Sequence, residues 1–461
     1  MPTPPYRMWD VVERASTGPF CEQEEFLKKI FVPKLREVVR KYDIKYDPKF
    51  PIPNDDSLVD GVWEAAVELF RDVGIYNQDT HRRVIFSDKE IQEALSSTIG
   101  EYNVGIGKDS RILQHREVED RTLPFVIFSP DIIFDEGDFL MACIAYLKEP
   151  LLDGFCAPIL EESMGMRIQS GTPVELAGSL EHAMSLREAA RLVGKPGVFL
   201  VAVGTSQSAA SQIAASDPEW GVRTTDSRLV GSITEFMTNN SMMNKAIHYQ
   251  QYGCYAGNLT GALYGGYAGG AEGTAVLEAA YHLNGLMVHQ SQYQMNFPYH
   301  LKYFSNTTRE LLWVVSVYSQ AVARHTRLVN VSNGFANAGP GTEMLFFEAA
   351  AHSVASTVSG ANLWEVAPAR NKNKNRATPL EARLAAEVGH AVARSGMTRE
   401  EANEVVNKLL GKYEDKIADA PLGKEFRECY NVRKATPTAD YIALYGDAKE
   451  EIAKIGIDFL Y

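Results

Sequence analysis

The chain has 461 residues, of which 45% are hydrophobic, and a formal net charge of −13. This length allows one large α/β barrel with extensions or two to three ordinary domains. The acidic balance comes without a basic stripe, so nucleic acid and anionic membrane are not expected partners. The first residues, MPTPPYRMWD, do not resemble a signal peptide, and no apolar run reaches the roughly 18 residues of a membrane helix. We expect a soluble, cytoplasmic protein.

The N-terminal segment is predicted to be helical. Apolar residues recur at helical spacing in 58–72, and Ser87 stands three residues before Glu90, which is the spacing of a capping box. From about residue 123 the pattern changes to short apolar runs that end in Gly, Pro, Ser or Asn and alternate with helical segments. We therefore predict a helical extension over 1–122, followed by βα units.

Eight apolar runs are candidate strands, and eight is the number that a closed (β/α)8 TIM barrel needs. They cover 124–129, 151–159, 197–204, 242–249, 262–267, 285–291, 299–304 and 327–333. The barrel is predicted over 123–375. Capping-box spacing at Thr378 and Thr398 indicates a C-terminal helical region over 376–461, packed on the barrel.

The cysteines and the glycine-rich tract carry little functional signal. The five cysteines are far apart and form no CxxC pair, so neither a disulfide framework nor a protein-bound metal is predicted. The tract 253–273 lacks the features of a P-loop or of a dinucleotide fingerprint. Two interpretations of it stay open, namely tight backbone packing or the close approach of a large ligand.

Polar residues that follow the predicted strands are the candidate site, because barrel enzymes place their sites at the carboxyl ends of the strands. His248, His289 and His300 lie in or beside such strands, although each is also compatible with a hydrogen-bonded core histidine. Nearby tyrosines, among them Tyr249 and Tyr293, can line a pocket or fill a core. These residues alone indicate no more than a barrel enzyme.

Several motifs, in order and with their spacing, resemble the monomethylamine:corrinoid methyltransferases of methylotrophic archaea. They are GIYNQDTHR (74–82), GKPG (194–197), GGYAGG (265–270), NTTRE (306–310), AGPGTE (338–343) and TPTADY (436–441). The resemblance implies a TIM barrel whose mouth receives a separate corrinoid protein, no cofactor bound in the chain itself, and a homo-oligomer. It agrees with the strand count, which is an independent observation.

The departures from this family concern its substrate pocket. The resemblance places the family's pyrrolysine on Val201 and its two pocket glutamates on Leu229 and Leu259. The family's pocket glutamine and tyrosine fall on Asn333 and Phe335. The pocket is therefore expected to be neutral and apolar, and a cationic amine that enters it would lose its hydration without an opposing charge.

The hypothesis that follows is the demethylation of a methoxylated aromatic compound. A phenol has a pKa near ~10, so a phenolate needs only one positioned donor in order to leave. We predict Tyr249, His289 or His300 as this donor, with Gln292, Tyr293 and Asn333 orienting the ring and Val201, Leu229, Leu259 and Phe335 forming the apolar wall.

Two alternatives stay open. One is a quaternary or methylated amine held over aromatic faces, whose amine leaves neutral. The other is a non-catalytic scaffold that docks the corrinoid protein.

Overall fold

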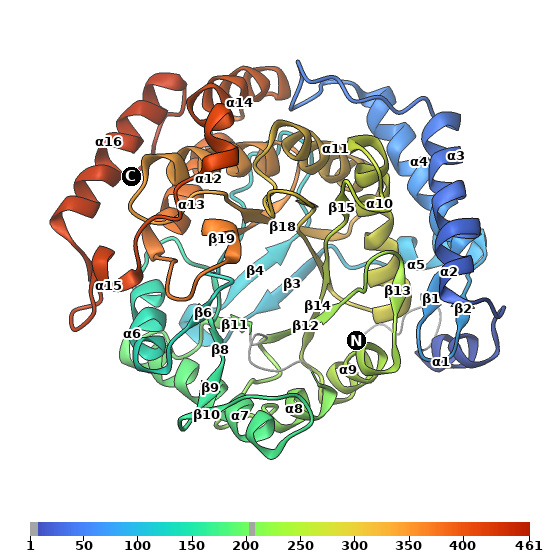
Figure 1. Cartoon of the computed structure of the whole chain (residues 1–461), viewed down its shortest axis with the longest axis horizontal. Coiled ribbons are helices and arrows are strands. Elements are labelled where there is room, and N and C mark those ends of the chain that lie inside the picture. The colour runs from blue at the N-terminus through green and yellow to red at the C-terminus, as the bar shows by residue number, and fades with distance from the viewer. Residues whose placement is uncertain (1–7, 202–207) are drawn as a thin grey trace.

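A closed barrel forms the centre of the molecule. The computed structural model describes residues 8–201 and 208–461, and within them eight parallel strands close in the order β11-β12-β14-β16-β18-β19-β5-β7. Figure 1 shows these strands surrounded by helices. The strands are β5 (Val126–Phe128), β7 (Gly154–Cys156), β11 (Phe199–Val201), β12 (Ser227–Gly231), β14 (Tyr255–Thr260), β16 (Tyr293–Asn296), β18 (Val329–Phe335) and β19 (Asn362–Ala367). The predicted (β/α)8 barrel is confirmed.

Helices connect the strands and cover the outside of the barrel. They are α6 (Glu136–Leu147), α7 (Pro173–Leu192), α8 (Ala209–Ala214), α9 (Asn240–Tyr252), α10 (Ala271–Asn284) with the π-helical turn η3 (Gly285–His289), α11 (Arg309–His325), α12 (Glu343–Val358) and α13 (Pro379–Ser395). Short paired strands lie outside the barrel ring, among them β6 (Ile133–Phe134), β8 (Ile159–Leu160), β15 (Leu263–Tyr264) and β17 (Tyr299–His300). The loop after β19 forms the 3-10 turn η4 (Ala369–Asn371).

Four of the eight predicted strands are not barrel strands. Residues 242–249 belong to α9, because the Asn239 side chain caps the Met242 amide and Gly253 ends the helix in a left-handed conformation. Residues 285–289 continue α10 as a π-helical turn, which Gln290 ends at φ 51°. The predicted runs 262–267 and 299–304 contain only the two-residue strands β15 and β17. The true strands β14 and β16 lie between these runs.

Two barrel strands, β12 and β19, were missed because buried polar side chains interrupt their apolar pattern. Arg228 in β12 donates hydrogen bonds to Gln212 and to Ser216. Glu365 in β19 pairs with Nδ1 of His352 at 2.7 Å. Both polar groups are buried with partners, as folded proteins require, but a hydrophobicity pattern does not reveal such partners. Residues 202–204 of the predicted strand 197–204 lie outside the described residues.

Large side chains fill the lower barrel. Tyr293 lies at the start of β16, and its hydroxyl is 2.9 Å from Oγ of Ser227 at the start of β12. A hairpin of β3 (Glu101–Val104) and β4 (Arg111–Gln114) covers this end, since its Val104 and Leu113 pack in the same core cluster as Tyr293. The barrel interior is therefore a packed core at this end, and a cavity opens toward the carboxyl ends of the strands.

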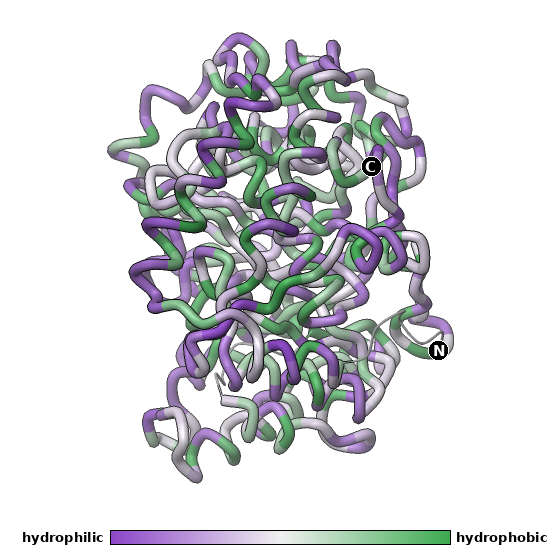
Figure 2. The backbone as a smooth tube through the Cα atoms, turned by 90° about the vertical axis from the view of Figure 1, so that its right-hand side faces the viewer, coloured by the Kyte–Doolittle hydropathy of each residue, from purple (hydrophilic) through white to green (hydrophobic). Residues whose placement is uncertain are grey.

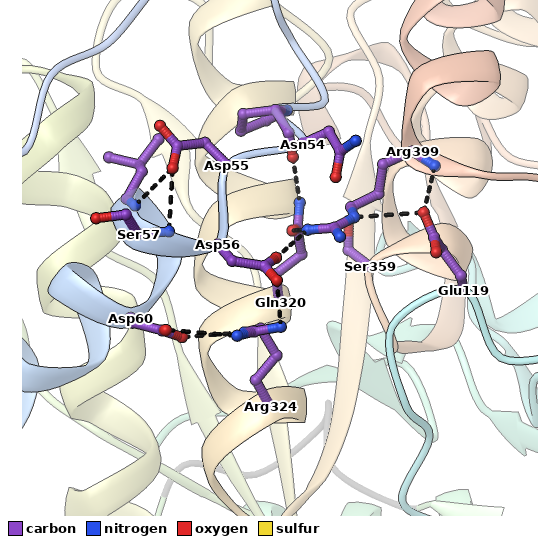
Figure 3. Close-up of polar contacts among 12 residues, drawn as sticks. Asn54, Asp55, Asp56, Ser57, Asp60, Glu119, Gln320, Arg324, Ser359 and Arg399 are labelled. Carbon is purple, nitrogen blue, oxygen red and sulfur yellow. Dashed lines mark hydrogen bonds and ion pairs between the residues drawn. The ribbon is translucent and has the colours of Figure 1, made fainter.

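Helical segments before and after the barrel are joined through α11. The N-terminal helices are α1 (Met8–Thr17), α2 (Gln23–Glu25), η1 (Phe26–Phe31), α3 (Val32–Lys41), α4 (Asp56–Val73) and α5 (Asp88–Ser96), and the C-terminal helices are α14 (Arg399–Tyr413), α15 (Phe426–Cys429) and α16 (Ala439–Ile455). Arg399 donates to Asp56 at 2.7 Å and to Gln320 at 2.9 Å, and these contacts are drawn as dashed lines in Figure 3. One buried guanidinium thus joins α14, α4 and α11. The segment boundaries at 122 and 375 stay predictions.

Helix starts follow the predicted caps. Ser87, Thr378 and Thr398 each form a capping box, with Glu90, Glu381 and Glu401 respectively. On the side of the molecule turned toward the viewer in Figure 2, hydrophobic and hydrophilic residues alternate along the helices, as expected for helices that pack one face inward.

Within the described ranges, no helix combines the length and apolarity needed to cross a membrane. All five cysteines are described, are buried and carry free thiols.

Candidate active site

A cavity of about 590 Å³ opens at the carboxyl ends of the barrel strands. It lies above the packed lower barrel, where barrel enzymes bind their substrates. Its walls come from strand ends and from the loops and helices that follow them. They include Asp131, Gln212, Leu229, Met242, Lys245, Leu259, Met295, Phe297, Tyr299, Phe304, Asn333, Phe335, Trp364 and Arg370. A volume of this size suits a small organic molecule.

Three aromatic rings form a stack on one wall of the cavity. The ring centroid of Phe297 is 5.4 Å from that of Phe335 and 5.9 Å from that of Tyr299. The interplanar angles are 27° and 11°, so the three rings are approximately parallel. All three side chains line the cavity. Aromatic faces carry negative partial charge, and this wall therefore suits a cation as well as an apolar group.

Asp131, two residues beyond the first predicted strand run, places a carboxylate in this cavity. Its Oδ2 accepts hydrogen bonds from Nδ2 of Asn333 at 2.7 Å and from Nε1 of Trp364 at 3.2 Å, and its Oδ1 accepts one from Oγ of Ser129 at 2.6 Å. The backbone of Asp131 is left-handed at φ 44°, a conformation that aspartate tolerates better than most residues. The loop thus holds the carboxylate in place with three donors.

These donors favour the ionised form of Asp131. Burial has the largest effect and leaves the pKa of the Asp131 carboxyl above its ordinary value, while the hydrogen bonds from Ser129, Asn333 and Trp364 each lower this pKa and so limit the rise. Neither the Asn333 amide nitrogen nor the Trp364 indole nitrogen can accept a proton from a neutral carboxyl. The arrangement is therefore built for a carboxylate, and a cation bound beside it would lower the Asp131 pKa further.

The opposite side of the cavity contains the leucines. Leu229 and Leu259 lie in β12 and β14, and both line the cavity. They are therefore within reach of a bound molecule, together with Asn333 and Phe335. Four positions that the sequence assigned to the substrate pocket thus border the cavity.

Two basic residues also line the cavity. Lys245 projects from α9 and is 6% exposed, and burial lowers its pKa to about 8. Arg370 lies in η4, and its guanidinium donates to the backbone carbonyls of Ile417 and Ala418. The cavity therefore contains both acidic and basic side chains, whereas the sequence indicated a neutral pocket.

The three predicted proton donors do not line the cavity. Tyr249 is fully buried in α9, and its hydroxyl lies 3.3 Å from the Leu229 carbonyl and 3.4 Å from Gln212. Both ring nitrogens of His289 have partners, Thr238 at 3.2 Å and Asn258 at 2.8 Å. Burial lowers the His289 pKa to about 3, so this ring is neutral. The expected strand positions of Tyr249 and His289 are wrong because both residues are helical.

His300 is half-buried in β17, outside the cavity wall. Its ring centroid lies 4.8 Å from that of Tyr264 and 4.6 Å from that of Tyr303, and its Nδ1 accepts a hydrogen bond from the Lys302 amide at 3.0 Å. Burial lowers its pKa. His300 therefore behaves as part of an aromatic cluster beside the mouth, while its neighbour Tyr299 lines the cavity.

Three predicted pocket residues do not line the cavity. Val201 and Tyr293 are fully buried in the apolar cluster inside the barrel. Gln292 precedes β16, and its side-chain oxygen accepts a hydrogen bond from the Ala256 amide at 2.7 Å. Gln292 and Tyr293 stand just before and at the start of β16, away from the carboxyl ends of the strands, and Val201 packs in the apolar cluster.

The glycine-rich tract serves backbone packing at Gly257. A Cβ at this position would lie 2.5 Å from Cζ of Tyr293 and 2.6 Å from Cδ2 of Leu229. Glycine is therefore required for the Tyr293 ring to cross β14. This contact supports the packing interpretation of the tract at that point.

Sequence reasoning missed Asp131, Lys245 and Phe297, whereas Phe335 of the aromatic stack was a predicted wall residue. Asp131 follows the first predicted strand by two residues, so its position was available as a signal. Lys245 was hidden inside a segment interpreted as a strand. Among residues 8–201 and 208–461, no three His, Cys, Asp or Glu side chains converge as a metal site.

Known proteins resemble this chain over nearly its whole length. The profile of the family described as monomethylamine methyltransferase MtmB matches residues 6–457. MtmB2 of Methanosarcina acetivorans and MtmB1 of Methanosarcina barkeri are each 30% identical over 454 residues, which is 98% of both chains. The crystal structure of the Methanosarcina barkeri enzyme matches with a TM-score of 0.94 at 29% identity, and that of a hydroxylamine MtmB complex gives the same values, each covering 98% of both chains.

These matches confirm the family resemblance that the ordered motifs implied. Because the matched family consists of methyltransferases, the chain is an enzyme of this class and not a non-catalytic scaffold. With the profile, the identity and the fold in agreement, the chain belongs to the monomethylamine methyltransferase (MtmB) family of corrinoid-dependent methyltransferases.

Proposed function

We propose that this methyltransferase removes a methyl group from a quaternary ammonium compound and transfers it to cobalt(I) of a partner corrinoid protein. The observation that carries the proposal is the Asp131 carboxylate, which three donors hold in a cavity beside stacked aromatic rings. A fixed carboxylate and aromatic faces together compensate the hydration that a cation loses on entering the cavity. An ether is favoured over a cation only in a pocket without a countercharge, and Asp131 supplies a countercharge.

The leaving group distinguishes a quaternary ammonium compound from the monomethylamine in the names of the relatives. Transfer of a methyl group from quaternary nitrogen breaks the C–N bond and leaves its electron pair on nitrogen, so a neutral tertiary amine departs. This step needs neither a proton donor nor an activating residue. Val201 stands where the resemblance places pyrrolysine, and no predicted donor reaches the cavity. The chemistry therefore fits the residues present.

The space available also favours a substrate larger than monomethylamine. The cavity of about 590 Å³ would leave most of its apolar lining in contact with water around a molecule of two heavy atoms. Leu229, Leu259 and Phe335 offer contacts to additional methyl groups. Burying these groups contributes about 0.8 kcal/mol for each buried carbon.

An aromatic methyl ether is the second candidate. Two apolar surfaces favour it, namely the leucines Leu229 and Leu259 and the stacked rings of Phe297 and Phe335. A flat aromatic ring would fit between these two surfaces. The donor to the leaving phenolate would then be the Lys245 ammonium, because it lines the cavity and Tyr249, His289 and His300 do not.

The homo-oligomer that the family resemblance implies stays a prediction.

The test combines the chain with a cobalt(I) corrinoid protein and follows the methylcobalt absorbance. Tetramethylammonium, choline, monomethylamine and 2-methoxyphenol are supplied in parallel. We expect methyl transfer from the quaternary ammonium compounds and little from the other two. Turnover with 2-methoxyphenol alone would establish the second candidate, and turnover with monomethylamine alone would mean that the substrate of the named relatives is retained.

A further inference from the structure

Lys245 differs from the other buried cations of the chain. Arg228 donates to Gln212 and Ser216, Arg187 pairs with Asp226, and Arg116 donates to four backbone carbonyls. By contrast, the Lys245 ammonium makes no hydrogen bond or ion pair with the described residues, although the side chain is only 6% exposed and lines the cavity. A buried ammonium without a partner among the described residues is costly, so its position in the cavity wall indicates a ligand.

The electrostatic surroundings of Lys245 support this interpretation. Burial lowers the Lys245 pKa to about 8, and the Arg228 guanidinium acts in the same direction. Glu175 opposes this effect from α7, but its carboxylate already accepts hydrogen bonds from Gly171 and Ser208. An anionic group in the cavity would give the ammonium a partner that the described residues do not provide.

The barrel topology separates Lys245 from Asp131. In the closed strand order, β14 is four strands away from β5 in either direction, so these two strands face each other across the barrel. Asp131 follows β5, and Lys245 lies in α9, the helix that leads into β14. The two charges therefore lie on opposite sides of one cavity of about 590 Å³.

We infer that Lys245 binds a carboxylate on the substrate, so that the substrate is a zwitterion with its quaternary ammonium group beside Asp131. This inference rests on the proposed function and narrows its substrate class. A zwitterion pairs Asp131 and Lys245 at once, whereas a simple cation offers no partner to the Lys245 ammonium. Electrostatic complementarity of this kind selects among molecules of similar size and shape.

Glycine betaine and choline are a matched pair of probes, because they share the trimethylammonium group and differ in carboxylate against hydroxyl. Calorimetric titration of the full chain measures their affinities without the corrinoid partner. We expect glycine betaine to bind at least about tenfold tighter than choline. Lys245→Met should weaken glycine betaine by at least about 30-fold and change choline by less than about threefold.

Two further variants complete the design. Lys245→Arg keeps the positive charge and should retain most of the affinity for glycine betaine. This variant still tests the inference if Lys245→Met does not fold. Lys302→Met removes a lysine outside the cavity wall and should change neither affinity.

Preference for choline over glycine betaine in the unsubstituted chain would overturn the inference and leave the proposed function intact. Equal loss of both ligands in folded Lys245→Met would also overturn it. Binding of 2-methoxyphenol but of neither quaternary ammonium compound would instead reject the proposed function itself.

Discussion

The two sides of the cavity differ in charge and polarity. One side, built from β18, β19 and the loop after β5, holds a carboxylate through Asn333, Trp364 and Ser129. The other side, built from β12 and β14, presents Leu229 and Leu259, where the family resemblance places two glutamates. The loss of acids on one side therefore does not make the cavity neutral, because the opposite side carries its own acid.

This difference shows why positions taken from a family outline are an incomplete guide to electrostatics. A cation in a cavity interacts most strongly with the charges nearest to it, because the Coulomb energy falls with distance, whichever strands carry those charges. Asp131 and the leucines face the same volume, so a countercharge on either side can compensate a cation. The consequence is that substrate charge is better inferred from the whole lining than from two aligned positions.

The largest expected effect comes from removing the charge on the Asp131 side. Asp131→Asn keeps the size of the side chain but leaves a bound cation without its carboxylate, which costs about 3–5 kcal/mol when a buried pair is broken. We expect kcat/KM for a quaternary ammonium substrate to fall by about 10²–10⁴-fold in the methylcobalt assay. Use of 2-methoxyphenol should change little.

The matched control for this variant is Asp138→Asn. Asp138 is also buried, but it pairs with Arg427 outside the cavity wall, so its replacement should leave kcat/KM unchanged. If Asp131→Asn keeps full activity toward quaternary ammonium compounds and remains folded, the carboxylate does not hold the substrate cation.

The second effect tests whether the countercharge can be moved across the cavity. In the Asp131→Asn background, Leu259→Glu returns a carboxylate to the leucine side, and we expect it to recover about tenfold of the lost kcat/KM. Leu259→Gln in the same background has similar size without the charge and should recover nothing. Equal recovery by both variants would attribute the effect to polarity or packing and would contradict the exchange of charge between the two sides.

The fold was largely predictable from the sequence, and the boundaries of its strands were not. Alternation of apolar runs and helical segments identified a barrel, because every βα unit repeats that pattern. The count of eight was correct, yet only half of the predicted runs are barrel strands. Short apolar runs in α9 and η3 look like strands because hydrophobic content does not distinguish a buried helix from a buried strand. Buried polar residues such as Arg228 and Glu365 hid β12 and β19.

The sequence predicted the site only at positions that correspond to pocket positions of the family. Leu229, Leu259, Asn333 and Phe335 border the cavity because their strands have the same places in the barrel as in the family. Asp131 has no counterpart among the pocket positions that the resemblance supplied, and its role depends on donors from residues about 200 positions away in the chain. Contacts over that separation come from barrel closure, which no local pattern encodes.

The third effect concerns the cation beside the leucine side. Lys245 titrates with a pKa of about 8, so its positive charge is present at pH 7 and is mostly lost at pH 9. An anionic group on the substrate stabilises the charged form, so affinity must decrease as pH rises. The other charged groups near Lys245 are Glu175 on α7 and Arg228 on β12, together with Asp131 and Arg370 in the cavity lining.

The measurement is the ratio of the affinities for glycine betaine and choline between pH 7 and pH 9. We expect this ratio to fall by about tenfold, since each unit above the pKa removes about nine-tenths of the ammonium. In Lys245→Arg the ratio should stay constant because arginine does not titrate in this range. A constant ratio in the unsubstituted chain would mean that another donor holds the carboxylate.

The smallest effect comes from one donor on the Asp131 side. Trp364→Phe keeps an aromatic ring in β19 but removes the indole N–H that donates to Asp131 at 3.2 Å. One hydrogen bond to a charged group is worth about 1.5–3 kcal/mol. The longer distance and the two remaining donors place the expected loss in kcat/KM for a quaternary ammonium substrate at about 3–10-fold. Trp313→Phe, in α11 and also buried, is the control.

The pH profile separates this positioning role from simple loss of packing. Removing a donor to a carboxylate destabilises its charged form and raises its pKa, so Asp131 would be protonated at a higher pH than in the unsubstituted chain. The acidic limb of the pH–activity profile should therefore shift to higher pH in Trp364→Phe but not in Trp313→Phe. A uniform decrease with an unshifted acidic limb would assign Trp364 to packing, and Asp131 would then depend on Asn333 and Ser129 for its charge.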